Sequence, residues 1–152
     1  MVEIERVMAD KRVYLYDSTL RDGAQTQGID FSTADKLAIA EALDRLGIDY
    51  VEGGWPGANP TDDAFFADPP AFTHAKLTAF GMTRRAGRSP ENDPGLAALF
   101  GTKAEAVCLV AKTWDFHVDV ALGIAPAENI DMIADSMVLA VSRAGEAMLD
   151  AE

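Results

Sequence analysis

The sequence predicts an α/β fold in which parallel strands alternate with helices. Short apolar runs of strand length alternate along the chain with segments whose apolar residues recur at helical spacing. Capping residues, prolines and glycines stand at the ends of the helical segments. This alternation favours one sheet of parallel strands covered by helices.

Five segments are predicted as strands because they are apolar and are flanked by polar or turn-forming residues. They are residues 13–16, 50–53, 76–80, 106–110 and 147–149. The run 13–16 is expected to be buried, because it is continuously apolar or aromatic and the polar site residues follow it directly.

The first predicted helix follows Ser32, which can form a capping box with Asp35, and it ends at Gly47. Its apolar stripe consists of Leu37, Ala40, Leu43 and Leu46.

Three further helices are predicted from prolines at the first helical position. Asn59 and Pro60 open a helix that runs through Phe66, and Asp93 and Pro94 open one through Phe100. The last opens at Pro126 and ends near Gly145. Its predicted buried face consists of Ile130, Ile133, Met137 and Val141.

Length and composition place limits on the class of protein. The 152 residues suffice for one domain, and the formal net charge of −12 argues against a nucleic-acid or anionic-membrane surface. The single cysteine, Cys108, lies in an apolar run and is expected to be a reduced core residue. No apolar stretch is long enough for a membrane span, and the first twelve residues lack the apolar core of a signal peptide, so a cytoplasmic location is expected.

A polar run, residues 17–25, follows the first predicted strand at its carboxyl end, where parallel α/β folds build their ligand sites. Within it, the guanidinium of Arg21 stands beside the carboxylate of Asp22. Such a pair can combine a metal ligand with a fixed positive charge that stabilises negative charge on oxygen. From the residues alone, a surface ion pair at the end of a strand is an equal alternative.

Residues 17–29, DSTLRDGAQTQGI, resemble the signature of the metal-dependent TIM-barrel family of 2-isopropylmalate, homocitrate and citramalate synthases and hydroxymethylglutaryl-CoA lyase. Residues 49–57, 80–85 and 112–118 resemble the citramalate synthase branch in the same order, and residues 149–152 resemble the end of its fifth strand.

The resemblance implies that residues 1–152 form the N-terminal part of a catalytic (β/α)8 barrel, about four and a half of its units. Pattern and length alone favour a five-stranded flavodoxin-like sheet instead, because a full barrel needs about 250 residues. A half barrel would leave two unpaired strand edges, from which we expect a homo-oligomer.

The implied reaction is a Claisen condensation of acetyl-CoA with an α-keto acid, pyruvate for a citramalate synthase, aided by a divalent Mg, Mn or Zn ion. The alternatives are a carbon–carbon lyase of the hydroxymethylglutaryl-CoA type and a non-enzymatic flavodoxin-like module. The family's H-x-H metal ligands are missing, because the chain has only His74 and His117. We therefore expect the isolated chain to be inactive.

The resemblance also implies roles for individual residues. Asp22 is the expected metal ligand, and Arg21 and Glu152 are the expected catalytic residues. The expected substrate-binding residues are Arg21, Gln25, Glu52, Lys112 and His117. Two of these residues have a structural alternative. Gln25 could form a hydrogen bond at the start of a helix, and Glu52 could hold another site residue in place without touching the substrate. Residues 83–85 follow the third predicted strand, where their cations could meet a carboxylate or a CoA phosphate, but a solvated loop is the favoured interpretation. His74 is assigned a structural role.

Overall fold

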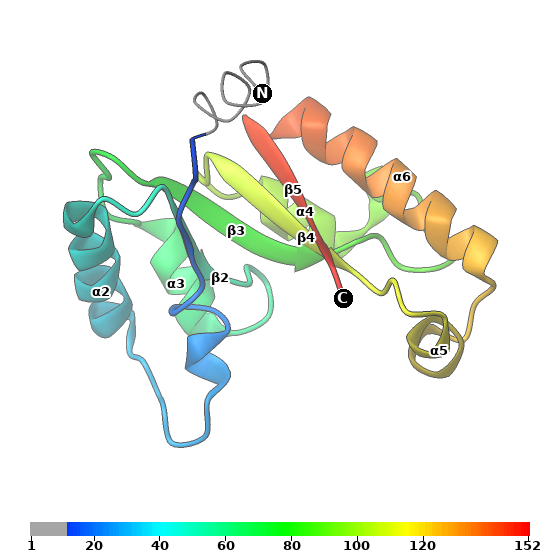
Figure 1. Ribbon diagram of the computed structural model, residues 1–152, viewed down its shortest axis with the longest axis horizontal. Helices are drawn as coiled ribbons and strands as arrows, with labels where there is room; N and C mark the ends of the chain where they lie inside the picture. The colour runs from blue at the N-terminus through cyan, green and yellow to red at the C-terminus, as the bar shows by residue number, and fades with distance from the viewer. Residues whose placement is uncertain (1–11) are drawn as a thin grey trace, which may run out of the picture.

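The computed structural model describes residues 12–152 and contains one sheet of five parallel strands (Figure 1). The strands are β1 (Tyr16–Asp17), β2 (Tyr50–Gly54), β3 (Lys76–Met82), β4 (Ala106–Ala111) and β5 (Glu146–Ala151). Each strand pairs in parallel with the next one along the sequence.

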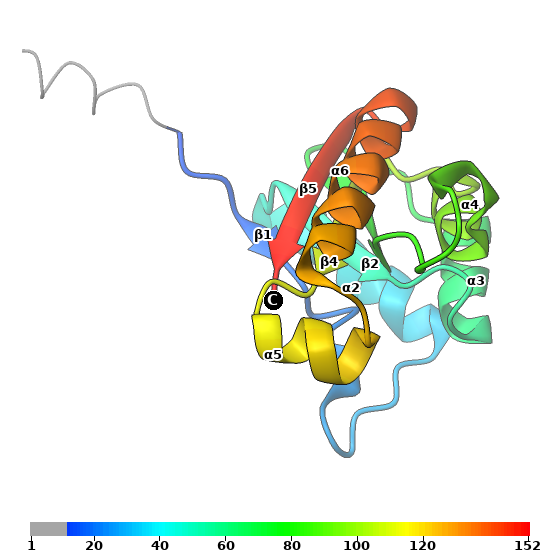
Figure 2. The same cartoon turned by 90° about the vertical axis from the view of Figure 1, so that its right-hand side faces the viewer.

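This strand order decides between the two predicted folds. A flavodoxin-like sheet has the order 2-1-3-4-5, whereas the order here is β1-β2-β3-β4-β5. Because every crossover proceeds in the same direction and such crossovers are right-handed, the helices lie on one face of the sheet (Figure 2). The sheet is therefore a curled half of a (β/α)8 barrel, which confirms the partial-barrel prediction.

The helices begin at the predicted capping residues. Ser32 and Asp35 form the capping box, and Gly47 ends the first helix with a φ of 86°. The side chains of Asn59 and Asp93 cap the next two. None of the helices in the described part of the chain is long and apolar enough to cross a bilayer. The bounds are α2 (Thr33–Leu46), α3 (Pro60–Ala67), α4 (Pro94–Phe100), α5 (Asp115–His117) and α6 (Pro126–Arg143), with short turns η1 (Gly23–Gln25), η2 (Pro90–Asn92) and η3 (Val118–Leu122).

The main core lies between the sheet and its helices. Outward-facing strand residues such as Val51, Leu77 and Leu109 pack there against Phe65 of α3 and Leu99 of α4. Cys108 is buried, as predicted, on the opposite face of β4, where it packs with Phe80 and Val110.

The predictions for the first and last strands were wrong in their bounds. Residues 13–15 lie outside β1, and Val13, Tyr14 and Leu15 are largely exposed. The physical reason is that β1 is an edge strand, which pairs with β2 alone within residues 12–152. At the other edge, β5 is longer than predicted, because each residue from Glu146 to Ala151 pairs with β4. Self-association through these two edges stays a prediction.

The predicted buried face of the last helix was wrong in part: Ile133 and Met137 are half-buried, and Met137 packs against the core, but the other two predicted residues face solvent. Ile130 and Val141 are 65% and 68% exposed. The residues of α6 that are buried are Asn129, Met132, Ser136 and Ala140. Two of these are polar because the helix also binds the strand ends: Asn129 donates to the carbonyl of Lys112, and Ser136 accepts from the amide of Arg84.

Asp44 fastens α2 to the chain that leads into β3. Its carboxylate accepts bonds from the amides of Thr73, His74 and Ala75 at 2.7–2.9 Å, and from the Thr73 hydroxyl at 2.8 Å. Burial by itself would raise the pKa of Asp44, but these hydrogen bonds lower it well below its usual range. His74 lies at this amino-terminal rim of the sheet, consistent with a structural role.

We predict that Asp44→Asn lowers the free energy of unfolding by about 3 kcal/mol at pH 7, because the charged acceptor is lost. The pKa of Asp44 is depressed in the folded state, so its stabilisation is complete above the unfolded value, about 3.9, and declines as pH falls below it. Urea unfolding at several pH values should show the difference shrinking below about pH 4. Asp131→Asn, on the exposed side of α6, is the control. A difference that does not change with pH would contradict this role.

Candidate active site at the carboxyl ends of the strands

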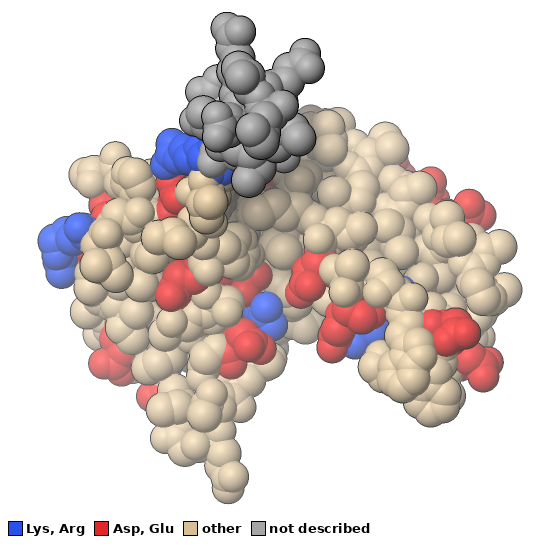
Figure 3. Space-filling model, in the orientation of Figure 1, with Lys and Arg blue, Asp and Glu red and all other residues tan. Residues whose placement is uncertain are grey.

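All five strands end at the same edge of the half barrel, and the loops that follow them surround a hollow. Figure 1 shows the loop after β1 and the helix α5 projecting from this edge on either side. In Figure 3 the surface is hollowed between them, and acidic and basic side chains gather there. The residues predicted as site residues come from these loops and strand ends.

Arg21 is held in one orientation above the sheet. Its Nε donates to Glu52 Oε2 at 2.7 Å, and its guanidinium carbon lies 3.9 Å from the centre of the Phe80 ring. The amides of Arg21, Asp22 and Gly23 all donate to the carbonyl of Ser18, which winds the chain into a tight turn. The Arg21 side chain is 17% exposed, so it is fixed by protein contacts yet still accessible to a ligand.

Glu52 provides the counter-charge from the end of β2. The residue is 1% exposed, and its second oxygen, Oε1, accepts a 2.6 Å bond from the hydroxyl of Tyr16. Burial would lower the pKa of Arg21, but the hydrogen bond and charge of Glu52 outweigh it and raise that pKa. Burial and the bond to Glu52 also raise the pKa of Tyr16. Both oxygens of Glu52 thus accept hydrogen bonds within the protein, and we interpret the carboxylate as the group that holds Arg21 in position.

Sequence reasoning missed Tyr16. It is the last residue of an apolar segment and lies one residue before the polar run. A tyrosine in that place is a usable signal, because a buried tyrosine hydroxyl usually has a hydrogen-bond partner. Its partner, Glu52, lies on the neighbouring strand and 36 positions away in the sequence. Only strand pairing brings the two together.

A buried ion pair shapes the end of β2. Lys36 of α2 pairs with Asp62 of α3 and also donates to the carbonyl of Gly53 at 3.0 Å. Asp62 in turn accepts from the amide of Trp55 at 2.8 Å. Gly54 must be glycine here, because its φ is 145° and a Cβ would lie 2.5 Å from the Asp62 carboxyl carbon. Trp55 is thereby set edge-on against Phe80, with ring centres 5.4 Å apart.

A second charged pair lies at the ends of β4 and β5. Lys112 Nζ is 2.5 Å from Glu152 Oε2, and the amide of Glu152 donates to the carbonyl of Ala111 at 3.0 Å. The bond and charge of Lys112 lower the pKa of Glu152, with smaller contributions from the charges of His117 and Arg21. Although Glu152 is the last residue, its backbone thus continues the pairing with β4.

His117 lies on α5 at the rim of the hollow. Its ring centre is 4.7 Å from that of Trp114, and its Nδ1 is buried without a hydrogen-bond partner in the described part of the chain. Asn129 Oδ1, on the neighbouring α6, is likewise buried and unpartnered among the described residues.

Asp22 and Gln25 lie close to Arg21 in the loop after β1. The Asp22 side chain is 64% exposed and touches Arg21 NH1 at 3.3 Å. Gln25, on η1, is exposed and lines a cavity of about 360 Å³ together with Arg21 and Trp55. The structure therefore brings Arg21, Asp22, Glu52 and Gln25 together, and it forms a separate pair from Lys112 and Glu152.

A divalent metal, which the resemblance implies, would require several ligands. Within residues 12–152, no three acidic, histidine or cysteine side chains converge on one point. The carboxylates of Glu52 and Glu152 at the mouth are paired with Arg21 and Lys112, which leaves the exposed Asp22, and a single carboxylate does not form a metal centre. The described residues by themselves do not fit such an ion.

Comparison with known proteins identifies relatives over nearly the whole chain. The family model described as HMGL-like matches residues 12–151. An (R)-citramalate synthase of Geobacter sulfurreducens is 46% identical over 142 residues, which cover 92% of this chain and 27% of the relative. One of Streptomyces coelicolor is 49% identical over 131 residues, covering 84% and 24%.

More distant relatives carry other names. A 2-isopropylmalate synthase of Solidesulfovibrio magneticus is 30% identical over 143 residues, covering 94% of this chain and 27% of the relative. The chain thus spans about a quarter of the length of these curated relatives. The solved hydroxymethylglutaryl-CoA lyase of Pseudomonas aeruginosa superposes with a TM-score of 0.70 at 17% identity, over 93% of this chain and 46% of that one. At that identity the likeness concerns the fold alone.

We predict that the two carboxylates beside Arg21 differ sharply in their effect on stability. Glu52→Gln leaves Arg21 without its buried counter-charge and should lower the free energy of unfolding by about 3 kcal/mol. Asp22→Asn is the matched control, because Asp22 is exposed, and its effect should stay within about 0.5 kcal/mol. Urea unfolding of both variants measures this. Equal effects would show that Glu52 does not hold Arg21.

Proposed function

The chain belongs to the HMGL-like family, and on that basis we propose that it contributes to an acyltransferase that condenses acetyl-CoA with a 2-oxo acid. Identities of 41–49% with proteins named (R)-citramalate synthase support pyruvate as the acceptor, because citramalate is the product of that condensation. The 2-isopropylmalate synthases, at 30–32% identity, support it less.

The proposed reaction needs stabilised negative charge on oxygen. The methyl group of acetyl-CoA loses a proton, and the resulting carbanion attacks the ketone carbon of the 2-oxo acid to form a carbon–carbon bond. The former ketone oxygen becomes an alkoxide and takes up a proton. Water then hydrolyses the thioester and releases CoA. Both the enolate and the alkoxide carry charge that a fixed cation can stabilise.

The orientation of Arg21 is the observation that supports this proposal most. Its bond to Glu52 and its stacking on Phe80 are made before any ligand binds, so little reorganisation is needed when charge develops nearby. A guanidinium is charged at any physiological pH, so Arg21 presents a permanent positive charge. Glu52 and Tyr16 serve as positioning residues for Arg21.

The other predicted residues take supporting roles in the proposal. Gln25 shares the Arg21 cavity and can hydrogen-bond a substrate carboxylate. Lys112 and His117 stand at the opposite rim of the hollow, where Lys112 offers positive charge and His117 a hydrogen-bonding ring to an anionic product. Glu152 is a weaker base than a free glutamate, because Lys112 lowers its pKa.

Asp22 is proposed as one oxygen ligand of the family's divalent metal, Mg, Mn or Zn. Such an ion would act as a Lewis acid toward the 2-oxo acid. The described residues supply no other ligands beside Asp22, and the roles proposed for Arg21, Glu52 and Lys112 do not depend on it.

We predict that the 152-residue chain alone has no turnover. Incubated with acetyl-CoA, pyruvate and Mn²⁺, it should release no free CoA above the background hydrolysis seen without protein. A thiol-trapping assay for CoA, together with chromatography for citramalate, measures this. Sustained release of CoA with matching citramalate would contradict the prediction and show that these residues form a complete site.

A chimera tests the function itself. In it, this chain replaces the segment that it matches in the Geobacter sulfurreducens citramalate synthase. We predict that the chimera forms citramalate from pyruvate, with slower turnover of a branched 2-oxo acid and no cleavage of hydroxymethylglutaryl-CoA. Arg21→Ala should lower kcat about 100- to 1,000-fold. Asp22→Asn should weaken activation by added metal.

Arg45→Ala serves as the matched control, because Arg45 is an exposed arginine of α2 whose partner among the described residues is Glu41. Its kcat should equal that of the unaltered chimera. A chimera that melts normally but turns over neither 2-oxo acid, or one in which Arg21→Ala and Arg45→Ala behave alike, would contradict the proposal.

A further inference from the structure

Tyr50 and Glu146 lie on strands that are not neighbours in the sheet, yet their side chains are hydrogen-bonded. The Tyr50 hydroxyl donates to Glu146 Oε2 at 2.6 Å, although β3 and β4 lie between β2 and β5. Lys76 of β3 pairs with the other oxygen of the same carboxylate. We call these three residues the clasp. None of the roles proposed above uses them.

The clasp lies on the concave face of the sheet, at the end away from Arg21. Val51, Leu77 and Ala147, which follow its three residues in sequence, pack in the core beneath the helices. Because successive residues of a strand point to opposite faces, the clasp residues point to the other side. Each of them is the first residue of its strand, so the clasp lies at the amino-terminal end of the sheet.

The bond between Tyr50 and Glu146 requires a curled sheet. Neighbouring strands lie about 4.8 Å apart, so the three intervals from β2 to β5 would separate them by about 14 Å in a flat sheet. Side chains stand roughly perpendicular to a sheet, so on a flat one these two would lie side by side without meeting. On a concave face they converge. The bond therefore stabilises one particular curvature.

The charges of the clasp strengthen it. Hydrogen bonds from Lys76 and from Tyr50 lower the pKa of Glu146, and the bond to Glu146 raises the pKa of Lys76 and that of Tyr50. Lys76 Nζ also lies 5.8 Å from the centre of the Tyr50 ring. Hydrogen bonds to a charged group are stronger than those between neutral groups. Removal of the Glu146 charge would therefore weaken the attachment of β5 to both β2 and β3.

A second contact spans an equal number of strands. Burial raises the pKa of the Cys108 thiol on β4, and the nearby hydroxyl of Tyr16 on β1 partly offsets this. The two groups approach across the concave face, because β2 and β3 lie between their strands. Cys108 is 7% exposed and packs with Phe80 and Val110. Its burial therefore also depends on the curvature of the sheet.

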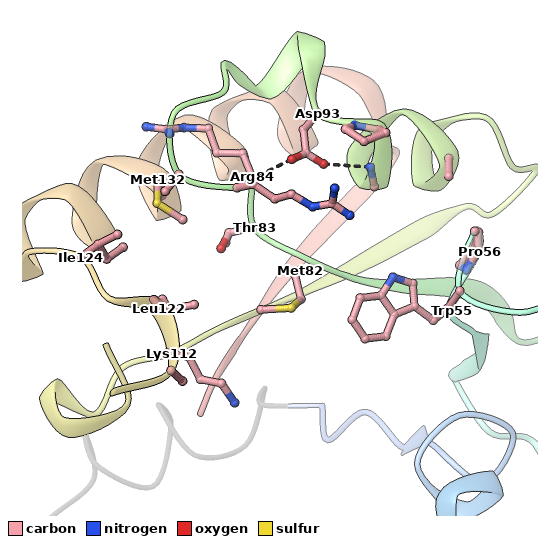
Figure 4. A pocket seen from close by; sticks show the side chains of 18 residues that line it. Trp55, Pro56, Met82, Thr83, Arg84, Asp93, Lys112, Leu122, Ile124 and Met132 are labelled. Carbon is pink, nitrogen blue, oxygen red and sulfur yellow. Dashed lines mark hydrogen bonds between the residues drawn. The ribbon is translucent and has the colours of Figure 1, made fainter. Parts of the chain in front are cut away.

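The curvature sets the width of the strand mouth as well. Figure 4 shows Trp55, which follows β2, and Lys112, which follows β4, on facing sides of a hollow with Met82 between them. This hollow has a volume of about 510 Å³. A flatter sheet would move Lys112 and its partner Glu152 away from the side of the mouth that carries Arg21.

We propose that the clasp is a conformational device that fixes the curvature of the half barrel. Tyr50 and Lys76 hold Glu146 and with it β5, an edge strand that pairs with β4 alone within residues 12–152. The clasp thereby keeps the mouth at one width, and its three members are positioning residues that act from the opposite end of the sheet. This role goes beyond the proposed condensation and does not depend on it.

The reaction of Cys108 with a thiol reagent tests the proposal, because Cys108 is the only cysteine of the chain and lies on the concave face. With an excess of dithiobis(nitrobenzoate) near neutral pH, the unaltered 152-residue chain should react slowly. Glu146→Gln should speed the reaction about tenfold and Tyr50→Phe about threefold, because the rate rises with the fraction of chains in which the clasp is open.

Two matched variants serve as controls. Glu105→Gln removes a carboxylate whose charge acts on Lys76 but whose side chain makes no hydrogen bond among the described residues. Tyr14→Phe removes the hydroxyl of a tyrosine whose ring centre lies 6.1 Å from that of Tyr50. Neither should change the rate. Lys76→Glu alone should speed the reaction, and combining it with Glu146→Lys should restore a slow rate, because the ion pair forms again with its charges exchanged.

Urea unfolding of each variant separates local opening from loss of the fold, because it gives the fraction of unfolded chain. A rate that rises more than this fraction supports the clasp. The mildest change, Tyr50→Phe, decides the question if Glu146→Gln does not fold. Three results would overturn the proposal: rates that follow the unfolded fraction alone, equal rates for Glu146→Gln and Glu105→Gln, or a charge exchange that restores nothing. Because this measurement needs no turnover, an inactive chimera overturns the proposed function and not the clasp.

Discussion

The carboxylate of Glu52 is almost fully buried. The arrangement of the strand mouth depends on the two side chains that donate hydrogen bonds to it. Tyr16 and Arg21 each donate to one of its oxygens. An unpaired buried carboxylate costs several kcal/mol, so folding itself forces both donors into place. The long side chain of Arg21 therefore loses its rotamer freedom during folding, before any ligand arrives.

The consecutive strand order explains why the site can be open on one side and rigid on the other. The helices α2, α3, α4 and α6 cover the same face, so the main core holds the strands from behind while the loops at their carboxyl ends remain accessible. The buried Lys36–Asp62 pair continues this support to the end of β2 and fixes Trp55. Trp55 then lines both the Arg21 cavity and a second hollow formed by the loops after β2, β3 and β4.

The distribution of cations at the mouth follows from their partners. Arg21, Lys112 and Arg84 each have a carboxylate within hydrogen-bond distance, whereas Arg85 has none among the described residues. The paired cations are held in fixed positions, and the unpaired one adds net positive charge to an otherwise acidic chain. The paired cations can therefore position an anionic ligand, whereas the unpaired Arg85 adds to the attraction of an anion toward the same rim.

The sequence by itself determined the local features: the helix starts at Ser32, Asn59 and Asp93, the stop at Gly47, and the family signature around Arg21. These are readable because a capping side chain acts on its own neighbouring backbone. The tertiary structure decided the exposure of residues 13–15, the buried face of α6, and the pairing of Arg21 with Glu52, 31 positions away. Each of these depends on which elements lie side by side, and periodicity along one segment carries no information about its neighbours.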